Sequence, residues 1–342
     1  MNSIDDKLKT TIAQYLASGI EKQVDYEKFY LYSIITHSTA IEGSTVTEVE
    51  NQLLFDEGIP SKRCTLDEQL MNLDLKDAYI YGFSWCKTPQ PYTVNLLRKL
   101  ASMVMRRTGT TYSVLGGEFD SSHGDLRLCN VSAGIGGSSY LSYTKVPRAT
   151  EEFCTWLNDS LAAIDCSDIA ACYRLSFEAH YRLVTIHPWV DGNGRTTRLL
   201  MNMIQRQLGL VPSIVTKENK GEYIQALIDS REAEDTTIIE DVMLRQHIDN
   251  LELRLLQYQK TASDTVNDTI GDTVKSSDKS TLLLKAIEQH PEYTYEQYAS
   301  LLGISRASIA RTIKKLISDS LIRRIGSDKN GHWEIVNKQE QL

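Results

Sequence analysis

Twelve consecutive residues near the middle of the 342-residue chain carry several groups that could handle a phosphate. Residues 187–198 read His-Pro-Trp-Val-Asp-Gly-Asn-Gly-Arg-Thr-Thr-Arg. His187 can take a proton near neutral pH, and the Asp191 carboxylate is a hard oxygen ligand of the kind that Mg²⁺ prefers. Gly192 and Gly194 allow the backbone to approach an anion closely. The other polar residues in the stretch that could bind an anion are Asn193, Arg195 and Arg198.

Apolar helical patterns lie on both sides of this stretch. Residues 179–186 are typical of the end of a helix, and residues 199–208 of the start of another, with Gly209 as its C-terminal glycine. The stretch is therefore predicted to be a loop that leads into a helix N-terminus, where free N–H groups and the helix dipole attract anions. Arg195 and Arg198, three residues apart, are expected to share the first helical turn. The set predicts a phosphate-handling site.

Each residue alone also has a structural explanation. Asp-Gly-Asn-Gly is ordinary turn chemistry, and a histidine before a proline can simply close a helix. The full set, however, resembles the signature of the Fic family, His-x-Phe-x-Asp/Glu-Gly-Asn-Gly-Arg-x-x-Arg. One fixed position departs from it, because Trp189 stands where the family usually has Phe. That position is an apolar anchor under the loop, for which the larger Trp is a tolerable substitute.

The resemblance implies a protein adenylyltransferase, which moves AMP from ATP to a Ser, Thr or Tyr hydroxyl of a target protein or of itself. It implies that His187 takes the hydroxyl proton and that Asp191 holds Mg²⁺. Arg195 and Arg198 would hold the β- and γ-phosphates. The remaining residues implied to bind the ATP phosphates, as an anion hole, are Gly192, Asn193 and Gly194.

The glycine at position 194 bears on which group is transferred. In the related Doc-type kinases a Lys replaces this glycine, and ATP is held the other way round. Gly194 therefore favours transfer of AMP over transfer of phosphate. Some relatives also remove AMP, with an inhibitory Glu activating water, so the same protein could catalyse the reverse reaction.

A second motif lies near the N-terminus, at residues 38–43, Ser-Thr-Ala-Ile-Glu-Gly. Ser38 and Glu42 are four apart and share one helix face, and Gly43 can end the helix. Alone, this is a helix end with a solvated Glu. It also resembles the family's inhibitory motif, Ser/Thr-x-x-x-Glu-Gly/Asn, which implies that Glu42 pairs with Arg198 and occupies the γ-phosphate position. The motif precedes the signature, which implies an inhibitory helix N-terminal to the core.

Two further features follow from the resemblance. Residues 109–147 are rich in Gly, Ser and Tyr, and the family's flap, which holds a target peptide by strand addition, is expected at about residues 138–146. Tyr223 begins a helix at a point where family members often place a nucleobase-contacting Tyr. The alternative is a half-buried Tyr on an amphipathic helix. His180 is predicted to be a packed core histidine.

The C-terminal part has a different organisation. Residues 260–280 are rich in Thr, Asp and Ser and are typical of a linker. Short helices at 282–289, 295–302 and 306–319, followed by strands at 321–325 and 332–336, resemble a winged helix-turn-helix. Residues 304–329 contain seven Lys or Arg against two Asp or Glu. These cations suit the DNA major groove, although a protein-interaction or dimerisation wing is an equal alternative. Those on the third helix are Arg306, Arg311, Lys314 and Lys315.

Composition limits the protein class. Hydrophobic residues make up 41% and charged residues 24%, and the net charge of −8 argues against non-specific nucleic-acid binding by the whole chain. The six cysteines form no C-x-x-C pair and are expected to be reduced thiols. Neither a signal peptide nor an apolar run of membrane-spanning length is visible. We therefore expect a cytoplasmic protein without membrane contact.

Together these features predict a mainly α fold: a Fic-type helical bundle with a short β-hairpin flap, and a C-terminal winged helix-turn-helix domain. The expected division is an N-terminal helical region at 1–105, a catalytic core at 106–259, the linker at 260–280 and the winged helix at 281–337. Family habit also implies a homodimer. The alternative function is a transcriptional regulator whose core only senses a nucleotide or partner, but the intact His187 favours an enzyme. Zinc hydrolase chemistry is remote, because no His-Glu-x-x-His is present.

Overall fold

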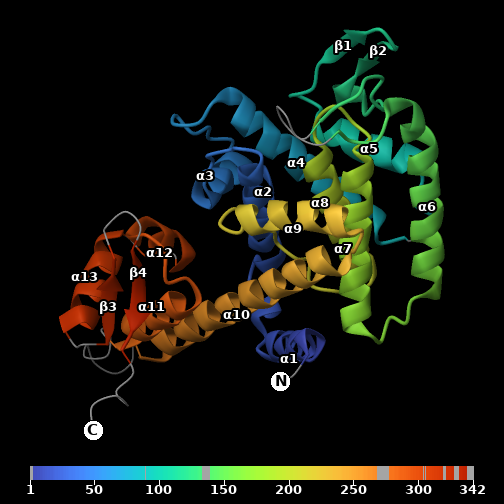
Figure 1. The fold of residues 1–342 in the computed structure, drawn as a ribbon. Helices are drawn as coiled ribbons and strands as arrows, with labels where there is room; N and C mark the ends of the chain where they lie inside the picture. The colour runs from blue at the N-terminus through green and yellow to red at the C-terminus, as the bar shows by residue number, and fades with distance from the viewer. Residues whose placement is uncertain are drawn as a thin grey trace. The chain divides into compact units, whose positions relative to one another are not determined.

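The computed structural model describes residues 3–88, 90–132, 139–267, 277–302, 304, 306–318, 321–326 and 331–336. The chain divides into two compact units, Met1–Gln259 and Lys260–Leu342. In the described residues each unit is mainly helical and carries one two-stranded antiparallel sheet (Figure 1). The mainly α fold class is thus confirmed.

The first half of the larger unit is a series of helices whose starts follow from capping residues. Thr47 and Thr65 each cap a helix in a capping box, in which the carboxylate of the Glu three residues later accepts from the backbone N–H of the Thr. Left-handed residues at Gly19 and Asp25 separate the first two α-helices. The elements are α1 (Ile4–Ala17), α2 (Tyr26–Ile41), α3 (Glu48–Gln52), a π-helix (Leu53–Glu57), α4 (Leu66–Trp85) and α5 (Val94–Val104).

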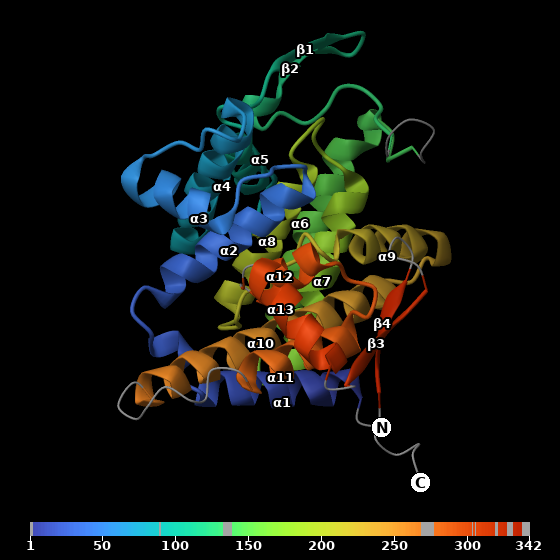
Figure 2. The same ribbon diagram turned by 90° about the vertical axis from the view of Figure 1, so that its left-hand side faces the viewer.

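A β-hairpin follows α5. Strands β1 (Thr111–Val114) and β2 (Gly117–Asp120) pair in register Thr111↔Asp120. The Tyr112 and Phe119 rings, on opposite strands, are stacked with their centroids 5.3 Å apart. The hairpin projects from the helices of its unit in both views (Figures 1 and 2).

The second half of this unit holds its central helix. The elements are α6 (Val146–Ala163), α7 (Ile169–Ile186), α8 (Asn193–Gln207), α9 (Lys220–Ala233) and α10 (Thr237–Asn267). Helix α8 contacts α2, α4, α5 and α7, and nearly all of its residues are buried. The packed helices therefore hold α8, and with it the residues of its first turn, in a fixed position.

Two predicted boundaries need correction. Helix α10 continues to Asn267 because neither Gly nor Pro interrupts the chain before Gly271, so the linker predicted at 260–280 begins as helix; residues 268–276 lie outside the described residues. The flap predicted at 138–146 has its extended backbone further upstream. Ser132 and Ser139 form a β-bridge, whereas Tyr143–Lys145 is a 3-10 turn that leads into α6. Pro in the first turn of α6 favours this early helix start.

The smaller unit consists of three helices and a two-stranded sheet. Its elements are α11 (Ser277–Gln289), α12 (Tyr295–Leu302), α13 (Arg306–Ser318), β3 (Ile322–Ile325) and β4 (His332–Ile335). Their order and ranges agree closely with the elements predicted here. The predicted turn glycine, Gly303, lies outside the described residues. The unit has its own core, which includes Leu283, Tyr298, Ile309, Ile313, Leu316 and Trp333.

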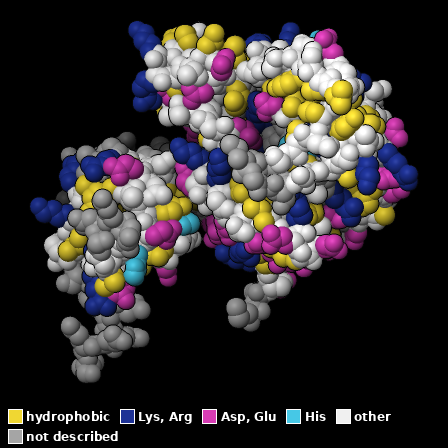
Figure 3. All heavy atoms as spheres, turned by 45° about the horizontal axis from the view of Figure 1, so that its top comes forward, with side chains coloured by type: hydrophobic (Ala, Val, Ile, Leu, Met, Phe, Trp, Pro, Cys, Tyr) yellow, Lys and Arg dark blue, Asp and Glu magenta, His cyan; other side chains and the backbone are white. Residues whose placement is uncertain are grey.

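Surface and cysteine chemistry are unexceptional. All six cysteines are free thiols. Lys and Arg are interspersed with Asp and Glu over the face shown in Figure 3. Within the part of the chain that the structure describes, no helix has the length and apolarity needed to cross a membrane.

Candidate active site

The signature loop connects α7 to α8 through two left-handed residues. His187 ends α7 with φ 53° and ψ 63°, a conformation uncommon outside glycine. Gly192, at φ 76°, precedes α8. Because α8 begins at Asn193, Arg195 lies in its first turn but Arg198 lies in its second. The expectation that both arginines share the first turn is therefore wrong, since the helix starts six residues earlier than the apolar pattern indicates.

Trp189 and Asn193 hold the loop in shape. The Trp189 side chain is 1% exposed, and its Nε1 donates to the Gly124 carbonyl at 3.2 Å. The Asn193 amide accepts from Trp189 N (3.1 Å) and donates to Trp189 O (2.8 Å). The side chain of Asn193 is thus committed to the loop, and only its backbone N–H at the start of α8 is placed to join an anion hole.

Arg195 is a buried cation with unused hydrogen-bonding capacity. It is 3% exposed, and its Nη2 contacts Met105 Sδ at 3.1 Å and lies 3.6 Å from Asp191 Oδ1. Its Nε and Nη1 have no hydrogen-bond partner among the described residues. Leaving buried N–H groups of a guanidinium unsatisfied is costly, and an anion at the N-terminus of α8 would satisfy them.

Arg198, by contrast, is hydrogen-bonded to the end of α2. Its Nε donates to Ser38 Oγ (2.9 Å), and its Nη2 donates to Ser38 O (2.9 Å) and Glu42 Oε1 (2.5 Å). Burial acts to raise the pKa of Glu42, but the Arg198 guanidinium outweighs it and holds that pKa below its usual value. Gly43, at φ 106°, then turns the chain away from α2. The structure thus brings together the N-terminal motif and the signature.

His187 is half-buried and lies against an aromatic ring. The Tyr140 ring stacks on it with centroids 3.8 Å apart and planes 17° from parallel. Burial lowers the pKa of His187 to about 4, and the cations Arg127 and Arg231 act in the same direction. Its Nδ1 lies 3.3 Å from the Val184 carbonyl. A carbonyl only accepts, so Nδ1 carries the proton and Nε2 remains the acceptor in a neutral ring.

Asp191 is the acidic residue of the loop. Its side chain is 60% exposed, and Oδ1 accepts from the N–H of Gly192 at 2.5 Å. Among the described residues, no group of three or more His, Cys, Asp or Glu could hold a metal. A single exposed carboxylate nevertheless fits Mg²⁺, which is usually held by one or two carboxylates together with substrate phosphates.

Tyr223 is not available to a nucleobase in this structure. It is 1% exposed, because it lies on the inner face of α9 in the core. Its hydroxyl lies 2.9 Å from His180 Nε2, and it also interacts with Arg198. The nucleobase role predicted from its position is therefore not supported. His180 is fully buried, as expected of a core histidine.

Sequence reasoning missed three residues around His187, namely Arg127, Tyr140 and Arg231. Arg127 donates to the His187 carbonyl, and the Arg231 guanidinium lies 5.0 Å from the centre of the Tyr140 ring. Arg127 and Tyr140 belong to loops without periodicity, and Arg231 resembles any cation on an amphipathic helix. No local signal distinguishes them.

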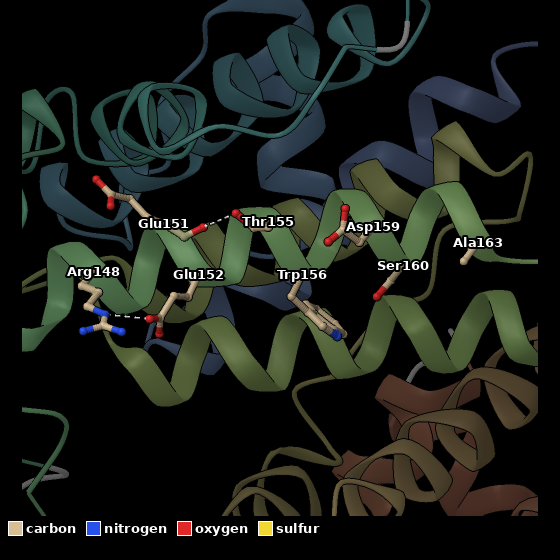
Figure 4. Close-up of a pocket in the computed structure, with 8 residues that line it drawn as sticks. All are labelled: Arg148, Glu151, Glu152, Thr155, Trp156, Asp159, Ser160 and Ala163. Atoms are coloured by element: carbon tan, nitrogen blue, oxygen red, sulfur yellow. Dashed lines mark hydrogen bonds and ion pairs between the residues drawn. The ribbon is translucent and has the colours of Figure 1, made fainter.

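A surface groove lies elsewhere in the larger unit. Figure 4 shows that its lining residues, which include Trp156, all come from α6. Arg148 and Glu152 form an ion pair along one helix face there. None of the signature residues contributes to it, so it is separate from the site around His187.

Comparison with known proteins agrees with this geometry. Residues 91–205, which contain the whole signature, match the sequence model of the Fic/DOC family. The chain is 29% identical over 204 residues to protein adenylyltransferase fic-1 from Caenorhabditis elegans, covering 59% of this chain and 36% of that protein. It is 27% identical over 229 residues to protein adenylyltransferase Fic from Drosophila melanogaster, covering 66% and 42%. The chain thus spans less than half the length of these curated relatives.

Solved structures show the same fold. A Fic domain-containing signalling protein from Bacteroides thetaiotaomicron superposes with a TM-score of 0.60 at 20% identity, covering 74% of this chain and 96% of the other. A Fic family protein from Desulfovibrio desulfuricans gives 0.58 at 18% identity, covering 100% and 98%. At this level of identity the likeness concerns the fold alone.

Proposed function

We propose that the protein is a protein adenylyltransferase that moves AMP from ATP to a Ser, Thr or Tyr hydroxyl of a target protein. The observation that carries this proposal is Arg195, a buried guanidinium with two unsatisfied nitrogens in the first turn of α8. It lies in the stretch that matches the Fic/DOC family model, and the same stretch contains His187, which its surroundings keep neutral at pH 7. Relatives of the chain named protein adenylyltransferases support the same reaction.

In the proposed reaction, His187 Nε2 accepts the proton of the target hydroxyl. The hydroxyl oxygen then bonds to the α-phosphorus of ATP, and the bond from that phosphorus to the oxygen bridging to the β-phosphate breaks. Pyrophosphate leaves with this electron pair. The Arg195 guanidinium and the free N–H groups at the start of α8 stabilise the phosphate charge. A neutral His187 suits this role, because a protonated ring could not accept the proton.

Magnesium fits the same site. Asp191 would hold the ion at the loop, where the ion would neutralise charge on the phosphates as pyrophosphate forms. The exposure of this carboxylate leaves room for the remaining ligands, which for Mg²⁺ are mostly phosphate oxygens and waters.

We propose further that Glu42 restrains the enzyme. Arg198 donates to Glu42 and twice to Ser38, so these contacts must break or shift before it can bind a γ-phosphate. A charge-assisted bond at 2.5 Å to a side chain that is 33% exposed is a strong competitor of the phosphate. Removing the carboxylate while keeping the arginine should therefore raise the rate of transfer.

The test uses the full chain with Mg²⁺ and ATP labelled either at the α- or at the γ-phosphate. Wild type, Glu42→Gly and Glu42→Gly/His187→Ala are compared, alone and with cell lysate as the source of target proteins. The proposal predicts α-label on protein in the Glu42→Gly sample, little in wild type and none in the double variant. Labelling from γ-labelled ATP only would establish phosphate transfer instead. Absence of label in all three samples, with lysate present, would contradict the transferase.

We also propose that the smaller unit binds DNA through α13. This helix buries Ile309, Ile313 and Leu316, and its opposite face exposes a set of cations. Such a face suits the phosphates and base edges of a major groove. These cations are Arg311, Lys314 and Lys315; Arg306 is also exposed, but it lies nearer the buried side and pairs with Glu296.

Fluorescence anisotropy with a labelled DNA duplex tests this second proposal. Lys314→Glu should weaken binding and reduce its salt dependence, whereas Arg323→Gln, which removes a cation paired with Glu334 on the hairpin, is the comparison. Equal affinity of wild type and Lys314→Glu would reject DNA binding by this face. A concentration-dependent dimer in sedimentation, lost in Lys314→Glu, would identify a dimerisation surface instead.

A further inference from the structure

Arg127 is a buried cation in the segment between the β1–β2 hairpin and the bridge at Ser132. It is 1% exposed, although it lies in neither a helix nor a strand. Its backbone N–H donates to the Pro188 carbonyl at 3.0 Å, and its Nε donates to the His187 carbonyl at 2.7 Å. One residue thus holds two successive carbonyls of the signature loop.

The other end of the guanidinium bonds the flap, by which we mean the two described segments that meet at the Ser132–Ser139 bridge. Nη1 donates to the Cys129 carbonyl at 2.8 Å, and Nη2 donates to the Leu141 carbonyl. Cys129 and Leu141 flank the paired segments, in which Tyr140 N donates to Val131 O at 3.1 Å. The guanidinium therefore connects both edges of the flap to the backbone of His187.

This arrangement is specific to arginine. Among the described residues, no carboxylate forms an ion pair with Arg127, so carbonyl oxygens alone compensate the cost of burying its charge. Its three bonds leave from three different nitrogens, in the directions that a planar guanidinium offers. A lysine carries its donors on one atom and cannot reach carbonyls on opposite sides at once.

The segment that Arg127 holds also includes a strained residue. His187 has φ 53°, and a non-glycine residue stays in this region only when its surroundings impose it. Tyr140, next to the Leu141 carbonyl, stacks on the His187 ring. The His187 carbonyl accepts directly from Arg127, and the ring of His187 stacks on Tyr140, whose neighbour Leu141 also accepts from Arg127. Both the backbone and the ring of His187 thus depend on Arg127.

We propose that Arg127 is a positioning residue that keeps His187 and the flap segment carrying Tyr140 in one fixed arrangement. The proposal rests on the proposed transferase activity, in which His187 takes the target proton and the flap aligns the target chain. Among the described residues, Arg127 forms no hydrogen bond to Gly192 or to the phosphate-binding residues of α8. Losing it should therefore slow the transfer step and leave the dependence on ATP concentration unchanged.

The test compares Arg127→Lys and Arg127→Met in the Glu42→Gly background, with Arg174→Met as the matched control. Arg174 is a half-buried arginine that pairs with Asp5, Glu240 and Asp241, and among the described residues it forms no hydrogen bond or ion pair with the loop or the flap. Self-labelling is followed with α-labelled ATP by the maximal rate and by the ATP concentration that gives half of it. Melting temperature is recorded for every variant.

Arg127→Met is expected to lower the maximal rate at least tenfold, with the half-saturating ATP concentration within twofold of its parent. Arg127→Lys should recover only part of the rate. Arg174→Met should lose as much melting temperature or more but keep its rate within twofold. Equal rates for Arg127→Met and its parent, or equal loss of rate in Arg174→Met, would overturn the proposal.

A second readout does not require activity. The wild-type chain with ¹³C-labelled histidine, and the same chain with Arg127→Lys or Arg174→Met, are titrated by NMR, with His187→Gln assigning the resonance. Arg127→Lys keeps the positive charge, which itself lowers the pKa of His187, so the variant reports the loosened flap alone. Loosening the flap should expose the ring, so Arg127→Lys should move the His187 midpoint up by one pH unit or more. The other charged groups near the ring, Arg231 and Glu42, stay unchanged. If the midpoint is the same in all three, Arg127 does not position His187, whether or not the protein is a transferase.

Discussion

Gly194 and Glu42 are in such close contact that a side chain at position 194 would force the Glu42 carboxylate to shift. A Cβ atom there would lie 2.5 Å from Glu42 Oε1 and 2.9 Å from Arg198 Nη1. The φ of Gly194 is not in the left-handed region, so backbone conformation does not explain the glycine. The lack of space for a side chain does. The residue that the sequence singles out for its effect on ATP orientation is thus also the residue against which the restraining carboxylate packs.

Gly194→Ala should therefore destabilise the protein by about 1 kcal/mol or more, since the added methyl group must displace the Glu42 carboxylate. Gly221→Ala is the control, because it lies in the first turn of α9 with nothing within 4 Å of its added Cβ. That change should be neutral or should stabilise by up to about 1 kcal/mol. Urea unfolding measures both, and a Gly194→Ala variant as stable as Gly221→Ala would contradict the packing described.

The site also makes stability depend on pH. The pKa of His187 is lowered from its ordinary value of 6.5 to about 4 in the folded chain, so the unfolded chain binds this proton first as the pH falls. The free energy of unfolding should therefore be highest above pH 6.5 and decline between about pH 6.5 and 4, by at most about 3 kcal/mol from this residue. His180 and His247, with pKa values lowered to about 3, act in the same direction.

Urea unfolding at pH 7.5 and pH 4.5 tests this with His187→Gln. The His187→Gln variant lacks the titration of residue 187, while His180 and His247 still titrate. The loss of stability between the two pH values should be smaller in the variant than in wild type by about 1–3 kcal/mol. An identical loss in both proteins would mean that His187 is not held neutral by its surroundings.

Trp189 should be a large contributor to stability. It fills the space under the signature loop and is 1% exposed, so Trp189→Ala should cost about 3–5 kcal/mol. Trp156, on α6, is only partly buried and lies under the Arg182 guanidinium at 4.2 Å. Trp156→Ala should cost clearly less. Thermal and urea unfolding of the two variants compare them, and an equal cost would show that Trp189 is not the anchor of the loop.

Asn72 holds the chain on both sides of Glu42. It is fully buried, accepts from Thr39 Oγ1 at 2.8 Å and donates to Ser44 Oγ at 3.1 Å. Asn72→Ala leaves these groups unsatisfied and should cost about 1–3 kcal/mol. It should also raise AMP transfer by the wild-type chain, because Glu42 is held less firmly. A destabilised variant with unchanged transfer would show that the network serves stability alone.

The sequence predicted those parts of the molecule that depend on local patterns. Apolar periodicity located the helices on both sides of the signature and the three helices of the smaller unit. The pairing of Glu42 with Arg198 was expected only through resemblance to a family motif, because 156 residues separate the two. Without that resemblance, Glu42 is an ordinary acidic residue at a helix end.

What the sequence did not reveal depends on contacts between distant loops. Arg127 and Tyr140 meet His187 from segments without periodicity, 60 residues before it in the case of Arg127. Tyr223 was placed on the correct helix but on the wrong face for a ligand, since its hydroxyl bonds His180 in the core. The helix start at Asn193 was missed because polar residues occupy buried positions of α8, where packing against four helices outweighs their polarity.

The central claim is that Glu42 restrains transfer by occupying Arg198, which a double-mutant comparison tests most directly. AMP transfer from α-labelled ATP is measured for wild type, Glu42→Gly, Arg198→Met and the variant with both changes. Glu42→Gly should be at least tenfold faster than wild type, and the double variant should be as slow as Arg198→Met, because the freed arginine is what binds the γ-phosphate. A double variant as fast as Glu42→Gly would contradict the account, since Glu42 would then act without Arg198.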